Sequence, residues 1–263
     1  MSSRTPTKST RRAPTPSVRL NNGIYKGELS LENGKNKKHG HGVMRFTNGD
    51  VYSGQWEHDQ MHGHGEMQYA DGGVYSGRWR KSEPHGHGEM QYANGDVYEG
   101  VLENGLPQGH GKMSYSNGNV FEGLWNSRMG TSVGEMRYVN AAGLENGVPL
   151  VYIGDLENGV PQGHGEMRYT NGNVYEGVWV GGLENGQGKM TYANGDVYTG
   201  NLEDGYPRAQ GTMRYANGNV YTGTWENGHP NGIGNMIYPS GVQESGNWVD
   251  GVLKGARATL RRK

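Results

Sequence analysis

The chain contains no cysteine, few phenylalanines and no long apolar run, and each shortage excludes a class of protein. Without cysteine, the chain forms no disulfide, no cysteine–zinc site and no thiol nucleophile. The longest apolar runs span only a few residues, so the sequence predicts no helix that crosses a membrane. The N-terminus also lacks the apolar core of a secretory signal. A cytoplasmic location is therefore expected.

Charge is unevenly distributed, although the net charge is only −1. Both ends are basic and lack acids, which leaves 15 Lys and Arg residues against all 26 Asp and Glu in the body. We therefore predict a disordered, Ser/Thr/Pro-rich basic tail (1–19), a repeat array (20–253) and a basic C-terminal tail (254–263). The candidate electrostatic tether residues are Arg4, Lys8, Arg11, Arg12, Arg19, Lys254, Arg257, Arg261, Arg262 and Lys263.

A 23-residue repeat organises the glycine-rich body. Each unit reads Tyr-x-Gly-x-Trp/Leu, then Gly-x-Gly, then x-Met-x-Tyr, and ends with Asn/Asp-Gly. An insertion at 144–151 follows the fifth unit, and the last unit is half-sized. The units start near residues 25, 52, 75, 98, 121, 152, 175, 198, 221 and 244.

Each unit has the residue pattern of a β-hairpin. Tyr75, Gly77 and Trp79 alternate along one short segment and so share a face. The pair Asn94-Gly95 suits a two-residue type I′ turn. The other connection, after Trp or Leu, is expected to be longer. Such hairpins placed side by side predict an elongated antiparallel meander with one row of Tyr, Trp and Met as its core.

The segment Tyr98-Glu-Gly-Val-Leu-Glu-Asn-Gly-Leu-Pro-Gln-Gly-His-Gly-Lys-Met-Ser-Tyr-Ser-Asn-Gly-Asn-Val resembles the MORN (membrane occupation and recognition nexus) repeat. Eight other full units between residues 25 and 243 resemble it too, followed by a half unit. The resemblance implies an all-β, elongated and twisted antiparallel sheet with an aromatic-lined groove. It also implies a non-enzymatic module, because MORN arrays occur in junctional membrane proteins, plant phosphoinositide kinases, radial spoke heads and parasite cytoskeletal scaffolds. In the fifth unit Ser132 and Val133 replace the usual Gly-His, and we expect a bend or break there.

The aromatic row is the candidate partner groove. A partner protein is expected to dock there, for instance as an amphipathic helix laid along the row. The candidate groove residues are Tyr52, Trp56, Tyr69, Tyr75, Trp79, Tyr92, Tyr98, Tyr115, Phe121, Trp125, Tyr175, Trp179, Tyr192, Tyr198, Tyr215, Tyr221 and Trp225.

Histidines recur in equivalent Gly-His-Gly positions, some of them preceded two residues earlier by a second histidine. Two rings on one strand face form half of a zinc or copper site. No cysteine and no fixed carboxylate completes the set, so we interpret the ladder as structural and assign no metal or cofactor. A metal half-site and pH-dependent assembly stay open as alternatives. The members of the ladder are His41, His64, His87, His110 and His164.

Catalytic motifs are missing from the sequence. There is no nucleophile elbow, and the nearest approach to a phosphate-binding loop, Gly186-Gln-Gly-Lys-Met190, opens a predicted strand instead of a helix. Glutamates recur at the same turn position in several units, as expected of a structural role and not of one acid–base pair. We therefore predict that the protein is not an enzyme.

Two functions fit these observations. The first is a scaffold that docks partner proteins, in a cytoskeletal or ciliary setting by resemblance to radial spoke proteins. The alternative is a peripheral membrane protein that binds anionic phospholipids or phosphoinositides, mainly through its basic tails. The acidic body opposes lipid binding, and no basic stripe for nucleic acid runs along the array. The exposed edge near Tyr25 favours a homodimer.

Overall fold

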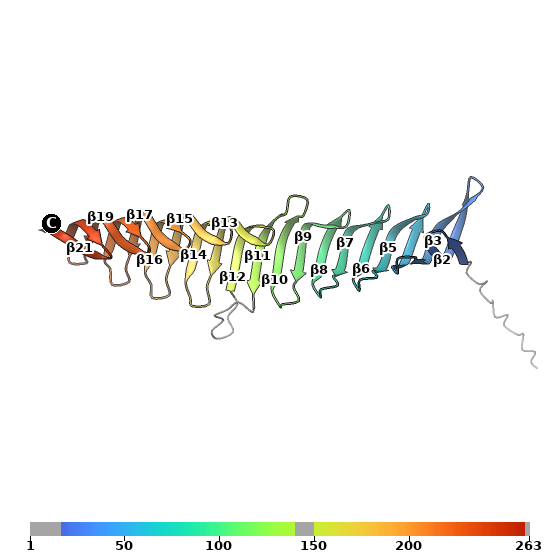
Figure 1. Cartoon of the computed structure of the whole chain (residues 1–263), viewed down its shortest axis with the longest axis horizontal. Helices are drawn as coiled ribbons and strands as arrows, with labels where there is room; N and C mark the ends of the chain where they lie inside the picture. The colour runs from blue at the N-terminus through green and yellow to red at the C-terminus, as the bar shows by residue number, and fades with distance from the viewer. Residues whose placement is uncertain (1–16, 140–149, 261–263) are drawn as a thin grey trace, which may run out of the picture. The chain divides into compact units, whose positions relative to one another are not determined.

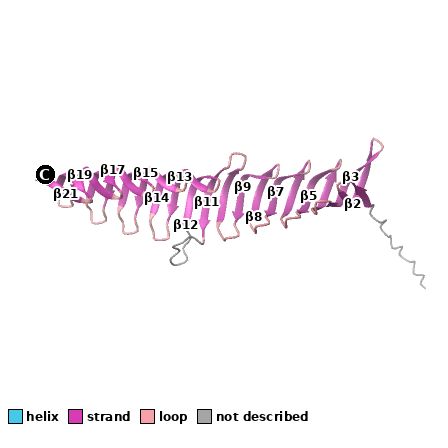
Figure 2. Cartoon of the chain, viewed as in Figure 1, coloured by secondary structure: helices cyan, strands magenta, loops and turns pink. Residues whose placement is uncertain are grey.

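The computed structural model describes residues 17–139 and 150–260, and this part of the chain is built of strands without a helix (Figure 2). The twenty-one strands form one antiparallel sheet. No helix in these ranges is long and apolar enough to cross a membrane. The predicted all-β antiparallel hairpin array is therefore confirmed.

The strands fall into two compact units, which divide within β8 (Val97–Glu103). Residues 101–105 belong to the first unit and residues 96–100 to the second. In each unit, strands that follow one another in the chain lie side by side (Figure 1). The first unit contains β1 (Ser17–Leu20), β2 (Gly23–Glu32), β3 (Lys35–Phe46), β4 (Val51–Glu57), β5 (Gln60–Gln68), β6 (Val74–Arg80) and β7 (Glu83–Gln91).

The second unit continues the same hairpin pattern. It contains β9 (Leu106–Ser114), β10 (Val120–Asn126), β11 (Thr131–Tyr138), β12 (Leu150–Glu157), β13 (Val160–Arg168), β14 (Val174–Val180), β15 (Leu183–Thr191), β16 (Val197–Glu203), β17 (Tyr206–Arg214), β18 (Val220–Glu226), β19 (His229–Ile237), β20 (Val242–Val249) and β21 (Val252–Leu260).

The two kinds of turn are the reverse of those predicted. The connection after Trp or Leu is a two-residue turn, in which Asn104 and Gly105 both have positive φ (52° and 78°), as type I′ requires. At the other end of the hairpin, only Gly95 of the Asn94-Gly95 pair has positive φ. The Gly95 amide donates to the carbonyl of Tyr92 at 2.9 Å, which closes a type I turn followed by a left-handed glycine. The prediction failed because Asn-Gly occurs in both turns and only its position relative to the strand ends separates them.

A bulge bends the second strand of most hairpins. Gly54 pairs with Gly65, but the next residue, Gln55, pairs with His62, so two residues of β5 have no partner on β4. One of the two is Gly63, whose φ of +60° is available to glycine at little cost. The same shift interrupts the β6–β7, β12–β13, β14–β15, β16–β17 and β18–β19 pairs.

The core lies on one face of the sheet. Burial alternates along the strands, so that β4 buries Tyr52 and Trp56 and exposes Ser53 and Glu57. Methionines such as Met67 come from the return strand of each hairpin and pack on the same face. The opposite face carries the polar residues, as the period-two pattern predicts.

The ends of the sheet extend beyond the predicted array of residues 20–253. β1 pairs Ser17–Leu20 with the start of β2 and so covers part of the edge at Tyr25. β21 includes residues 254–260 of the predicted C-terminal tail, and it completes the last half unit as a hairpin with β20. Residues 1–16 of the predicted disordered tail (1–19), most of the 144–151 insertion and residues 261–263 lie outside the described residues. The homodimer stays a prediction.

The fifth repeat does not break the sheet. β11 pairs with β10 over seven residues and with β12 over eight, without a register shift in either pair. The expected break is therefore wrong, because Ser132 and Val133 keep the strand extended where other repeats bulge.

Candidate functional site

The first aromatic residue of each full repeat, a tyrosine in all but the fifth, lies in the core. The Tyr52 side chain is fully buried, and its ring covers the Gly54–Gly65 pair of its own hairpin. A Cβ atom added at Gly65 would lie 2.2 Å from the Tyr52 hydroxyl oxygen, so the ring requires glycine there. The hydroxyl donates to the Gln55 carbonyl at 2.9 Å, and Tyr75 repeats this bond to Arg78 at 2.8 Å. Burial raises the pKa of Tyr75 to about 12, so this hydroxyl stays a donor at neutral pH.

Each tryptophan links its repeat to the one before. The Trp79 indole N–H donates to the carbonyl of Gly65 in the preceding hairpin at 3.1 Å. Its ring meets Tyr75 of its own repeat and Tyr52 of the previous repeat edge to face, with centroids 5.1 Å apart in both cases. Such pairs contribute about 0.5–1.5 kcal/mol each beyond area burial. The aromatic row therefore connects neighbouring repeats.

This placement decides which of the candidate groove residues a partner can reach. The buried ones are at most 4% exposed and offer no surface: Tyr52, Trp56, Tyr75, Trp79, Tyr98, Phe121, Tyr175, Trp179, Tyr198, Tyr221 and Trp225. The half-buried ones are Tyr69, Tyr92, Tyr115, Trp125, Tyr192 and Tyr215. The accessible part of the predicted groove is thus mainly the second tyrosine of each repeat.

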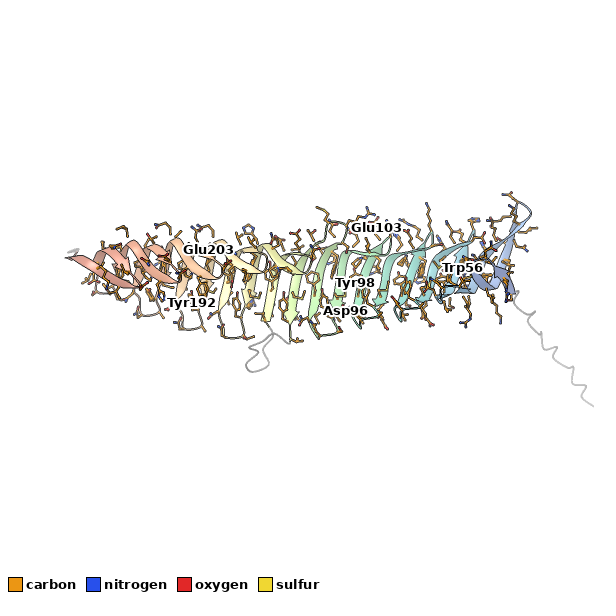
Figure 3. All side chains as sticks on the ribbon, viewed as in Figure 1. Trp56, Asp96, Tyr98, Glu103, Tyr192 and Glu203 are labelled. Atoms are coloured by element: carbon orange, nitrogen blue, oxygen red, sulfur yellow. The ribbon has the colours of Figure 1, made fainter. Side chains whose placement is uncertain are left out.

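These second tyrosines follow the Met-bearing strands, next to the turns closed by a left-handed glycine. In the second unit Tyr192 lies at one end of the strands, and Glu203, beside a type I′ turn, lies at the opposite end (Figure 3). Burial raises the pKa of Tyr69, Tyr192 and Tyr215, which keeps these rings neutral.

The histidine ladder lies on the exposed face. All five Gly-His-Gly histidines are exposed, and Arg78 stands directly opposite His64. His41 approaches the Glu28 carboxylate at 3.9 Å, while His62 approaches Glu57 at 3.4 Å. Within residues 17–139 and 150–255, no three His, Asp or Glu side chains gather closely enough to hold a metal ion.

The candidate tether residues lie at the two ends of the chain. Arg19 belongs to β1, and Lys254 and Arg257 belong to β21. The remaining seven lie outside the described residues: Arg4, Lys8, Arg11, Arg12, Arg261, Arg262 and Lys263.

The fifth repeat holds a cavity that the sequence did not predict. Its hairpin keeps the repeat length, but a four-residue turn, 127–130, replaces the usual two-residue turn and the bulge is missing. A cavity of about 260 Å³ opens there between Tyr115, Phe121, Trp125 and Met136. The available signal was Gly130, which stands where most other repeats have a proline.

A MORN repeat model matches the chain eight times, at residues 35–51, 52–74, 75–97, 98–120, 152–174, 175–197, 198–220 and 221–243. These matches cover more than half of the sequence. The chain belongs to the MORN repeat family. The model does not match the fifth unit, where the cavity lies. No curated protein matches the sequence of this MORN protein.

Solved structures resemble the fold at low sequence identity. The TCP10 domain of Danio rerio CPAP, in complex with a peptide of Danio rerio STIL, is 15% identical with a TM-score of 0.50. That match covers 88% of the MORN protein and 98% of the domain. The TCP domain of Drosophila melanogaster SAS-4, in complex with a proline-rich motif of Ana2, is 16% identical with a TM-score of 0.37. It covers 70% of the MORN protein and 90% of that domain.

Proposed function

We propose that this MORN protein is a non-catalytic scaffold that binds partner proteins along the polar face of its sheet, in a cytoskeletal or ciliary assembly. The observation that carries the proposal is the difference in residue composition between the two faces of the sheet. The core face carries the same residue types in most hairpins, whereas the residue at a given position on the polar face changes from repeat to repeat.

One row of the polar face illustrates this change. In the first unit it includes His41, Gln55, His64 and Arg78, which are charged or titratable except for Gln55. In the second unit, Gln187 bonds Asn201 at 2.8 Å and Gln210 bonds Thr224 at 3.3 Å. A face whose chemistry differs along its length suits several partner segments, each docking at its own repeats. The peptide complex of the CPAP domain supports a protein as the partner class.

Affinity capture from the source cells, followed by mass spectrometry, tests the scaffold. The face variant combines Gln187→Arg with Gln210→Arg, two exposed positions of the polar face. The matched control combines Ala193→Arg with Ala216→Arg, two exposed turn positions of the same repeats. We expect the wild type and the control to recover the same partner set and the face variant to lose at least one member. Absence of any reproducible partner, or full recovery by the face variant, contradicts the proposal.

A further inference from the structure

The fifth repeat lacks a residue that fills the core in its siblings. Opposite the Trp or Leu of each of the other hairpins for which this pair is described, the return strand has a proline or a large side chain. Pro84 opposite Trp79 and Pro161 opposite Leu156 are both buried, and Met61 opposite Trp56 is 8% exposed. In the fifth repeat the residue opposite Trp125 is Ser132.

Two cavities flank this smaller residue. The first, of about 260 Å³, is lined by aromatic and apolar side chains together with uncharged polar groups, and it contains no charged residue. The second, of about 420 Å³, is lined by Asp155 and Glu157 and by no Lys or Arg. Both cavities share Trp125, Thr131, Ser132 and Leu156, so they open on two sides of the same four residues.

Exposed apolar side chains lie around the opening. Leu124 and Val133, which line the second cavity, are 44% and 42% exposed, and Met129 in the adjacent turn is 71% exposed. Trp125 is half-buried, whereas Trp79, Trp179 and Trp225 are at most 3% exposed. The apolar side chains at this opening lie close together in the sequence and beside both cavities, an arrangement suited to contact with a partner.

We propose that this site binds an extended segment of a partner protein, which inserts a proline into the first cavity and places a Lys or Arg against Asp155 and Glu157 in the second. The proposal rests on the scaffold function proposed above and locates one of its docking points. Proline fits the first cavity because the sibling repeats fill the corresponding place with their own proline. Three aromatic rings line it, Tyr115, Phe121 and Trp125, and aromatic-lined grooves suit prolines of extended segments, whose backbone loses little freedom on binding. The cation follows from the two exposed carboxylates of the second cavity, whose lining contains no Lys or Arg.

Binding of the full-length protein to a synthetic peptide array tests the site. Each nonapeptide has a central proline and two arginines, with the remaining positions varied. One companion array replaces the proline by alanine, and another replaces the arginines by glutamate. We expect a subset of the proline–arginine peptides to bind, and both companion replacements to weaken those peptides at least tenfold.

Two variants of the protein are designed to block the site. Ser132→Met places in the cavity the residue that Met61 supplies opposite Trp56, and Thr131→Arg adds a cation at an exposed position of the rim. We expect each to weaken binding of the selected peptides at least tenfold. Ala216→Met, at an exposed turn position outside the site, is the matched control and should leave binding unchanged. Circular dichroism verifies that each variant is folded, and the surface position of Thr131 keeps the test decisive should Ser132→Met unfold the hairpin.

Either of two results overturns the inference: no peptide binds better than its alanine counterpart, or Thr131→Arg binds the selected peptides as tightly as the wild type does. Cellular capture separates this failure from failure of the scaffold. If Thr131→Arg retains every captured partner and the array shows no binding, the scaffold stands and this docking point is wrong. If the wild type captures nothing, the scaffold itself fails.

Discussion

At the scale of single residues, Ala209 has a strained backbone conformation. It has a φ of +57° at the bulge of β17, where Gly40, Gly63 and Gly163 have φ values of +60°, +60° and +80° in their own repeats. The left-handed conformation costs a residue with a Cβ atom roughly 1–2 kcal/mol. Glycine removes that cost but adds freedom to the unfolded chain, which offsets up to about 1 kcal/mol of the gain.

Ala209→Gly is therefore expected to stabilise the protein by about 0.5–1 kcal/mol. The midpoint of urea denaturation, followed by circular dichroism, measures the change. Gly109→Ala is the matched reverse substitution, since Gly109 has a φ of +69° and its added Cβ meets nothing within 4 Å. It should destabilise the protein by a similar amount through the backbone alone. An unchanged or lower midpoint for Ala209→Gly contradicts the assignment of strain.

Glu184 is a second residue out of pattern. It stands opposite Trp179, at the position that Pro84 occupies opposite Trp79. Its carboxyl group accepts a hydrogen bond from the Tyr169 hydroxyl, and burial raises its pKa above the ordinary glutamate value. The folded state therefore binds this proton more tightly than the unfolded state does.

Because the pKa of Glu184 is raised in the folded state, the stability of the protein depends on pH. The contribution from Glu184 is fully present below the unfolded pKa of glutamate and is lost as pH rises through the higher folded pKa. We expect Glu184→Gln to remove this fall, so that the variant gains stability relative to the wild type as pH rises from about 4 to 7. Urea denaturation at several pH values measures the difference. The exposed Glu176→Gln is the control, and equal pH profiles for Glu184→Gln and the wild type would contradict the prediction.

At the scale of the elements, the turns of neighbouring repeats are bonded in series. The Asp196 carboxylate accepts the Ala216 amide of the next turn at 2.7 Å, and the Asn173 side chain accepts the Ala193 amide at 3.0 Å. These bonds explain why Asp or Asn follows the Asn-Gly pair in successive repeats. They satisfy turn amides that the sheet itself leaves without a partner.

Asp196→Ala should cost about 1 kcal/mol of stability, because the Ala216 amide loses its acceptor. Native-state hydrogen exchange localises the effect: the Ala216 amide should exchange faster, while amides in β10 keep their rates. Asp196→Asn should preserve the protection, since Asn173 makes the same bond in the preceding repeat. Unchanged exchange at Ala216 in the alanine variant would rule out this role.

At the scale of the whole molecule, the free energy of unfolding is expected to be a sum of contributions from each repeat and from its contacts with adjacent repeats. Each strand in the described pairs bonds only to the strands before and after it in the sequence. A defect in one repeat therefore weakens its neighbours and leaves distant repeats unchanged.

Gly211→Ala tests this expectation. The added Cβ would lie 2.2 Å from the Tyr198 hydroxyl oxygen, so the ring must leave its place over the glycine pair. Hydrogen exchange should accelerate in β16–β18 and stay unchanged in β2–β6. Gly241→Ala, whose Cβ meets nothing within 4 Å but whose φ is +82°, should produce a smaller effect confined to the last hairpins. Uniform acceleration in both units after Gly211→Ala would show global cooperativity instead.

The sequence by itself determined the repeat length, the strand type and which residues enter the core. These follow from period-two alternation and from the 23-residue spacing, both of which are local properties that hold in every unit. The places of Tyr75 and Trp79 within the repeat could be predicted without tertiary information, because each hairpin packs against neighbours of the same sequence pattern.

The tertiary structure alone decided what those aromatic residues do and where the sheet is irregular. Tyr52 and Trp56 were predicted to line a partner groove. In the structure, rings from adjacent hairpins cover one another, and that burial depends on contacts between repeats. The turn types depend on the position of Asn-Gly relative to strand ends that a periodic sequence does not mark. The fifth repeat has the usual length, but its turn is two residues longer and its strand lacks the two-residue bulge. Because the length is unchanged, only the packing around Trp125 reveals the cavity.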